Sequence, residues 1–230
     1  MAWSEWWTVF GLGLTLGFKH ALDSDHLVAV MSLVTETRSI RKSALFGATW
    51  GVGHTVTLLA CGAVILLFRI QFPARLAMSF EFLVGIMLVI LGVHVVIKAV
   101  REKVHIHWHT HGDITHIHFH SHKHGADHDH VHLRRPLLVG IVHGLAGSGA
   151  LTLLVLSTLH SVIQGLLFIL IFGLGSILGM MLTGAVISVP FLWTQRLTRV
   201  HRVVQSLAGL LSIGLGIVIM LEIIAAFSAA

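Results

Sequence analysis

One short segment gathers side chains that could do chemistry inside an apolar part of the chain. From Gly17 to His26 it reads Gly-Phe-Lys-His-Ala-Leu-Asp-Ser-Asp-His, so two imidazoles and two carboxylates lie close together. Ionisable groups at membrane depth cost about 2.5–3.5 kcal/mol each on insertion scales, and they usually face a bundle interior or a water-filled cavity. The segment therefore indicates an ion or proton site.

The spacing within this segment suggests which side chains act together. In a regular helix His20, Asp23 and His26 share one face. Asp25 points elsewhere in a regular helix. It either supports an imidazole ligand without contacting the metal, or it joins the site because the helix breaks near Ser24. Imidazole with carboxylate suits Ni²⁺, Co²⁺, Zn²⁺ or Fe²⁺, whereas Cu(I) prefers sulfur ligands. We therefore expect a site for a divalent transition metal.

Further ligands are expected from later parts of the chain. His54 follows Gly51-Val-Gly53, and these glycines let its helix approach closely, so it is the expected additional ligand. His143 is open between a ligand and a hydrogen-bonded packing residue. Ser148 and Ser176 are further candidates from the second half of the chain. The glycines around Ser148 are equally well explained by close helix packing.

Lys19 is the one cation beside these residues. Next to His20 it would repel a metal ion. Its long side chain either reaches the membrane interface or pairs with Asp23 while the site is empty. In the second case, metal binding would displace the pair.

A second histidine-rich feature lies between residues 105 and 132, which hold twelve of the nineteen histidines. Spacing by two predicts a small hairpin turning near 111–114, and a disordered loop is the alternative. Such a density of histidine is typical of metal capture, which should weaken as pH falls through about 6.5. The candidate capture residues are His105, His107, His109, His111, His116, His118, His120, His122, His124, His128, His130 and His132.

The elements that must position these residues are membrane spans. Hydrophobic residues make up 55% of the chain and charged residues 11%, and the mean hydropathy is +0.89. We expect an all-α integral membrane protein, because six apolar stretches can cross a hydrocarbon core of about 30 Å. Cys61 is the only cysteine, which excludes a disulfide within the chain and a cysteine-based metal site. The predicted spans are 7–33, 43–68, 78–100, 136–158, 162–190 and 203–227.

Basic residues predict the orientation. Twelve Lys and Arg residues lie in or beside the loops after the first, third and fifth spans, against Arg69 and Arg75 on the other side. By the positive-inside rule both termini are extracytoplasmic and the His-rich loop is cytoplasmic, in a bacterial or archaeal cell membrane. This bias explains the net charge of +5 without a nucleic-acid partner. The first span should be retained, because Trp3, Trp6 and Trp7 resemble an interfacial belt rather than a signal peptide.

The two halves of the chain resemble each other at an offset of 122–124 residues. Because each half has three spans, the second must have inverted topology, which places a transport site near the midplane between the halves. We expect a first repeat over 1–100, the loop over 101–135 and a second repeat over 136–230. The matches are Gly17-x-x-His20 with Gly140-x-x-His143, Gly51-x-Gly53 with Gly173-x-Gly175, Gly62-Ala-Val-Ile65 with Gly184-Ala-Val-Ile187, and Gly85 and Gly92 with Gly209 and Gly216.

These motifs resemble the nickel/cobalt transporter family. His20-x4-Asp25-His26, Gly53-His54-Thr55 and the His-rich loop carry the resemblance, and the size and the segment 140–148 are similar to its shorter, urease-accessory-like branch. The resemblance implies that His20, Asp25, His26 and His54 are transport-critical Ni²⁺ or Co²⁺ ligands. The chain lacks the extra helices of longer members, and residues 146–149 replace their acidic second signature.

The leading interpretation is a transporter of Ni²⁺ or Co²⁺, with Zn²⁺ or Fe²⁺ as other cargoes, no permanently bound cofactor, no enzyme activity and no nucleotide site. One alternative is a membrane metallochaperone or buffer that supplies nickel to maturation proteins of a cytosolic enzyme such as urease. Another is a haem protein that uses pairs among His20, His54, His94 and His143. The neighbouring carboxylates argue against haem. Residue types alone leave import and export open.

Overall fold

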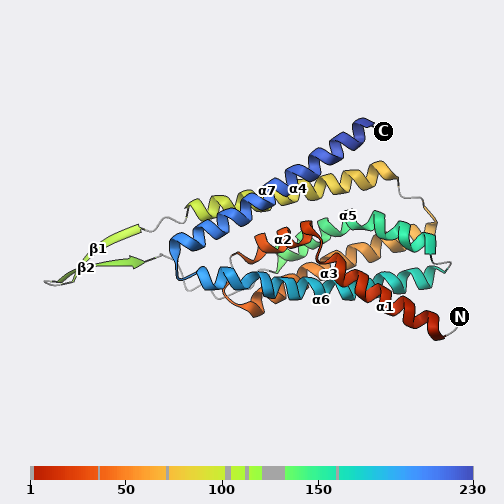
Figure 1. Ribbon diagram of the computed structural model, residues 1–230, viewed down its shortest axis with the longest axis horizontal. Coiled ribbons are helices and arrows are strands. Elements are labelled where there is room, and N and C mark those ends of the chain that lie inside the picture. The colour runs from red at the N-terminus through yellow and green to blue at the C-terminus, as the bar shows by residue number, and fades with distance from the viewer. Residues whose placement is uncertain are drawn as a thin grey trace.

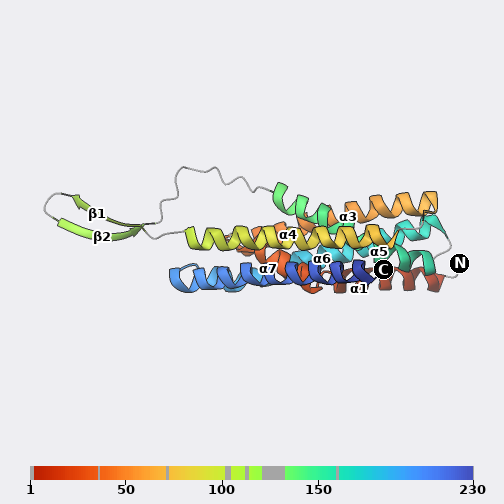
Figure 2. The same ribbon diagram turned by 90° about the horizontal axis from the view of Figure 1, so that it is seen from above.

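A computed structural model describes residues 3–35, 37–70, 73–101, 105–111, 114–120, 133–158 and 161–229. Only the backbone is described for 3–9, 105–111, 114–120, 148–158 and 229, so the predicted tryptophan belt lies outside the described side chains. The described helices form an elongated bundle, and a hairpin extends beyond one end of it (Figures 1 and 2). The elements are α1 (Trp3–His20), α2 (Ser24–Val34), α3 (Ile40–Phe68), α4 (Ala74–Arg101), β1 (His105–His111), β2 (Ile114–His120), α5 (Arg134–Thr158), α6 (Val162–Thr194) and α7 (Thr198–Ala229).

The first predicted span, 7–33, is two helices. α1 ends at His20 and α2 begins at Ser24. The turn between them is held by backbone hydrogen bonds from Leu22 N–H to the Lys19 carbonyl, 2.9 Å, and from Asp23 N–H to the His20 carbonyl, 3.1 Å. Asp23 has extended backbone angles and is the N-cap residue of α2. The break near Ser24, one of the two predicted alternatives, is therefore present.

Four helices in the described part of the chain are long and apolar enough to cross a membrane: α3, α4, α6 and α7. These helices confirm the prediction of an integral membrane protein. The other predicted spans correspond to α1 with α2 and to α5. α2 has eleven residues, so it is too short to cross by itself.

The helices that carry the candidate residues pack closely around α3. α3 packs against α5 and α6, α6 also packs against α1, and α4 pairs with α7. Glycine allows two of these approaches, since a Cβ at Gly17 would lie 1.9 Å from the Phe172 carbonyl oxygen and one at Gly144 would lie 2.6 Å from the His54 carbonyl oxygen. The C-terminal end of α1 and the middle of α5 are thereby held beside α6 and α3.

The described part of the His-rich segment forms the predicted hairpin. β1 and β2 pair antiparallel, and histidine lies opposite histidine at three positions of the register, His105 with His120, His107 with His118 and His109 with His116. The turn residues 112–113 and the candidates His122, His124, His128, His130 and His132 lie outside the described residues. The start of α1 and the end of α7 lie toward the end of the bundle away from the hairpin (Figure 1).

Candidate metal centre

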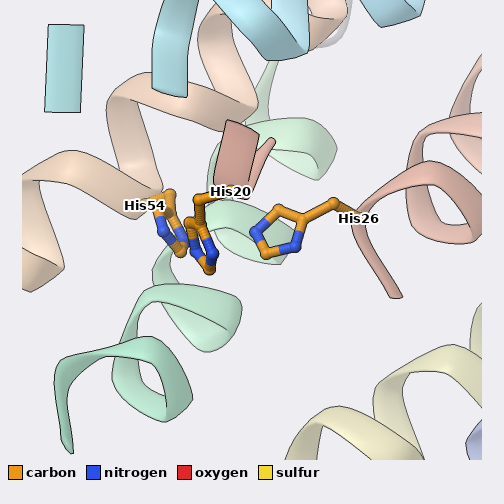
Figure 3. Close-up of side chains that lie close together, drawn as sticks. All are labelled: His20, His26 and His54. Carbon is orange, nitrogen blue, oxygen red and sulfur yellow. The ribbon is translucent and has the colours of Figure 1, made fainter. Parts of the chain in front are cut away.

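Three histidines from three helices meet in the bundle. His20 is the last residue of α1, His26 lies in the first turn of α2, and His54 lies in the middle of α3. The rings lie together (Figure 3), with centroids separated by 4.4 Å for His20 and His26 and by 5.3 Å from each of these to His54. One nitrogen from each ring lies within 4.8 Å of the others. This spacing allows the three imidazoles to bind one ion.

Several nitrogens of these rings lack a hydrogen-bond partner. His26 is 1% exposed and His54 is 0% exposed. Among the described atoms, His26 Nε2 and both ring nitrogens of His54 are buried and unpaired. Buried polar groups are normally paired, and leaving one unpaired costs about 1–3 kcal/mol. A metal ion would satisfy one nitrogen of each ring, because neutral imidazole is a common ligand of divalent transition metals.

The carboxylates of Asp23 and Asp25 each contact the Nδ1 atom of a histidine, which leaves the Nε2 atom of that ring to bind a metal ion. Asp23 Oδ2 lies 2.8 Å from His20 Nδ1. Asp25 Oδ1 accepts a hydrogen bond from the His26 backbone N–H, 3.0 Å, and lies 3.2 Å from His26 Nδ1. A carboxylate placed in this way orients the imidazole and raises its basicity toward a metal. Both aspartates are thus arranged as supports of the three-histidine group.

His143, which the sequence left open, lies in the same site. Its Nε2 is 2.8 Å from Asp25 Oδ2, and its ring stacks on His26 with centroids 4.1 Å apart. The side chain is buried and Nδ1 has no partner among the described atoms. Asp25, His26 and His143 form a second group whose potential ligand atoms lie within 4.8 Å of one another.

Other predicted residues have different places. The Ser176 hydroxyl donates a hydrogen bond to the Gly17 carbonyl, 3.1 Å, which ties α6 to α1 beside the site. The Ser148 side chain lies outside those described. Lys19 is exposed, and the described contacts pair Asp23 with His20, so of the two alternatives for Lys19 the pair with Asp23 does not form. His94 is exposed on α4 and belongs to neither group.

Two further residues border the histidines. A Cβ at Gly147 of α5 would lie 3.5 Å from His54 Cε1 and 3.7 Å from His20 Nε2, so this glycine borders the group directly. The buried Trp50 ring has its centroid 5.3 Å from that of His26. Trp50 lies one helical turn before His54, and that spacing could have identified it. For Gly147 the sequence offered only a glycine-rich segment.

Comparisons with known proteins relate this chain to membrane proteins. The family model described as the cytochrome C biogenesis protein transmembrane region matches residues 27–218, a span that begins directly after His26 and includes His54 and His143. The urease accessory protein UreH of Bacillus sp. (strain TB-90) is 37% identical over 193 residues, which are 84% of this chain and 82% of that protein. No solved structure matches.

Proposed function

We propose that this chain, which belongs to the cytochrome c biogenesis protein transmembrane region family, transports Ni²⁺ or Co²⁺ across the membrane. It is also a homologue of the urease accessory protein UreH, and its motifs resemble those of the nickel/cobalt transporters. The observation that carries the proposal is the group of His20, His26 and His54 with unpaired buried nitrogens. Zn²⁺ and Fe²⁺ fit the same donors, and the homologue's name favours nickel.

Transport explains the position of this group better than a fixed metal site does. The group lies in a bundle of apolar helices, at a helix break, and broken helices line the ion sites of many transporters. Both comparisons point to a non-enzyme. The sequence has a single cysteine, Cys61, so a reversible dithiol–disulfide cycle within this chain is not available.

The proposal includes the inverted repeat. Reciprocal glycine contacts between α4 and α7 support it, because Gly85 and Gly92 match Gly209 and Gly216 at an offset of 124. A Cβ at Gly85 would lie 2.9 Å from the Gly216 oxygen, and one at Gly216 would lie 2.5 Å from the Gly85 oxygen. A Cβ at Gly92 would lie 2.4 Å from the Gly209 oxygen, and one at Gly209 would lie 2.8 Å from the Gly92 oxygen. Gly85 corresponds to Gly209 and Gly216 corresponds to Gly92 in the repeat, so the contact of Gly85 with Gly216 becomes the contact of Gly209 with Gly92 when the two halves are interchanged. A twofold relation between the halves requires this.

The same exchange relates contacts beside the site. A Cβ at Gly17 would meet the Phe172 oxygen at 1.9 Å, and a Cβ at its repeat mate Gly140 would meet the Trp50 oxygen at 2.1 Å. Trp50 and Phe172 are themselves 122 positions apart. This agreement favours six spans, arranged as repeats over 1–100 and 136–230, with the site between them.

The hairpin completes the proposal. Its histidines would capture ions on the cytoplasmic side, and nickel-enzyme maturation proteins are the partners that the homologue's name suggests. In the proposed orientation both termini are extracytoplasmic. The hairpin therefore concentrates the ion at one mouth of the path, and the intramembrane group passes it across the bilayer.

Flux into proteoliposomes tests the proposal. Wild-type protein should carry Ni²⁺ or Co²⁺, His26→Ala should abolish flux, and His94→Ala should leave it unchanged, because His94 lies outside both groups. Replacing the twelve loop histidines by serine should weaken apparent affinity with little loss of maximum rate. Flux of Zn²⁺ alone would overturn the proposed cargo. Tight Ni²⁺ binding without flux would instead identify a buffer or metallochaperone.

A further inference from the structure

We propose that the membrane site holds its ion at two adjacent positions that share His26, and that the ion passes from one to the other during transport. Position 1 consists of His20, His26 and His54, and position 2 consists of Asp25, His26 and His143. This inference rests on the proposed transport function and adds a second binding position and a transfer step to it.

The two ring nitrogens of His26 have different surroundings. Nδ1 lies 3.2 Å from Asp25 Oδ1, while Nε2 has no partner among the described atoms. The ring lies between that of His20, at a centroid distance of 4.4 Å, and that of His143, at 4.1 Å. One imidazole therefore borders both groups, and an ion can move between them while it stays in contact with His26.

The two positions differ in their hydrogen bonds before an ion binds. At position 1, His26 Nε2 and both nitrogens of His54 are unpaired, so an ion can bind there without breaking a hydrogen bond. At position 2, Asp25 Oδ2 already lies 2.8 Å from His143 Nε2. An ion at position 2 replaces this contact, and His143 then carries its ring proton on Nδ1, which has no partner.

Charge compensates for the lost hydrogen bonds at position 2. Position 1 offers three neutral imidazoles, whereas position 2 includes the Asp25 carboxylate. The attraction between a divalent cation and a carboxylate is strong where the effective dielectric constant is low. The two positions can thus have similar affinities, which permits transfer in either direction.

The positions also differ in the helices that supply them. All ligands of position 1 come from α1, α2 and α3, in the first half of the chain. Position 2 joins Asp25 and His26 of α2 to His143 of α5, in the second half. Movement of one half against the other would change the geometry of position 2 and leave position 1 intact. Such movement is the usual basis of alternating access.

Visible spectra of Co²⁺ bound to the purified full-length protein test the two positions. His26→Ala removes the shared ligand and serves as the blank, so that binding by the loop histidines cancels. Relative to this blank, His143→Ala should bind Co²⁺ with the spectrum of a site whose protein ligands are imidazoles alone. His54→Ala should bind Co²⁺ with a different spectrum, that of a site that includes the Asp25 carboxylate. Both variants should lose flux about tenfold or more, because losing a ligand should cost at least as much as losing a residue that only supports a ligand, which typically costs about 10–100-fold.

The outcomes separate this inference from the proposed function. Identical spectra for the His54 and His143 variants, or loss of all membrane-site Co²⁺ in His143→Ala, would contradict two positions. Wild-type flux in His143→Ala would contradict the transfer step. A wild-type protein without flux would contradict the proposed function, whatever its spectra. If an alanine variant does not fold, the measurement is repeated with His54→Gln and His143→Gln, because glutamine fills more of the space of the histidine side chain.

Discussion

Each imidazole of the site is controlled by what its second nitrogen contacts. Asp23 takes Nδ1 of His20 and Asp25 takes Nδ1 of His26, so both rings keep Nε2 for an ion. The sequence analysis grouped His20, Asp23 and His26 on one helical face and left the role of Asp25 open. Since α1 ends at His20, Asp23 turns back onto that residue, and the predicted pairing with Lys19, which needed an unbroken helix, does not form.

Gly147 offers a residue-scale test of the site. In Gly147→Ala the added methyl would lie 3.7 Å from His20 Nε2, an ordinary contact, so the fold should tolerate it. The methyl would occupy space beside the ligand nitrogens, and we expect Ni²⁺ affinity to fall about tenfold, which corresponds to about 1.4 kcal/mol. Competition binding to protein whose loop histidines are serine measures the affinity, and thermal unfolding measures the fold.

The matched control for this change is Gly214→Ala, because a Cβ at Gly214 has no heavy atom within 4 Å. It should leave the affinity unchanged and should not lower the unfolding temperature, because alanine favours a helix more than glycine does. Wild-type Ni²⁺ affinity in Gly147→Ala would show that the ion lies away from this side of the histidines.

At the scale of elements, two features place the site: the break between α1 and α2, and the close approach of helices at glycine. The break puts the end of one helix and the first turn of the next beside α3, so that His20 and His26 face His54. Asp25 in the first turn of α2 also lies where a helix N-terminus favours a negative charge. The pairing of α4 with α7 stabilises the bundle away from the histidines.

Gly92→Ala tests the α4–α7 pairing. The added Cβ would lie 2.4 Å from the Gly209 carbonyl oxygen, and backbone cannot move aside as a flexible side chain can. The helices must separate, and we expect a loss of about 1–3 kcal/mol in stability, as for other overpacked sites. Thermal unfolding in detergent measures it, with Gly214→Ala of α7 as the control. An unfolding temperature equal to that of wild type would contradict the close approach.

At the scale of the whole molecule, the hairpin lies beyond one end of the bundle and the start of α1 and end of α7 lie toward the other (Figure 2). This arrangement agrees with the proposed topology, in which the His-rich segment and the termini face opposite compartments. It also agrees with the distribution of Lys and Arg, because α4 ends and α7 begins at the hairpin end (Figure 1), and both of these helix ends carry basic residues.

Cysteine labelling tests the orientation. In a Cys61→Ser background, Ala74→Cys and Ser228→Cys should react with a membrane-impermeant maleimide added to intact cells. Thr198→Cys, which is exposed at the start of α7, should react only after the membrane is opened, because the neighbouring arginines favour the cytoplasmic side. The opposite pattern would invert the topology and place the hairpin outside the cell.

The sequence by itself determined the membrane class, the residues able to bind a metal and the two alternatives for the first span. These follow from hydropathy, ligand chemistry and local spacing, which are properties of neighbouring residues. Only the tertiary structure decided that the His143 ring contacts the Asp25 carboxylate and that the Ser176 hydroxyl donates a hydrogen bond to the Gly17 carbonyl. It also placed Gly147 beside the histidines. Each of these depends on distances between helical residues about ninety or more positions apart in sequence, and such distances are set by how the whole bundle packs.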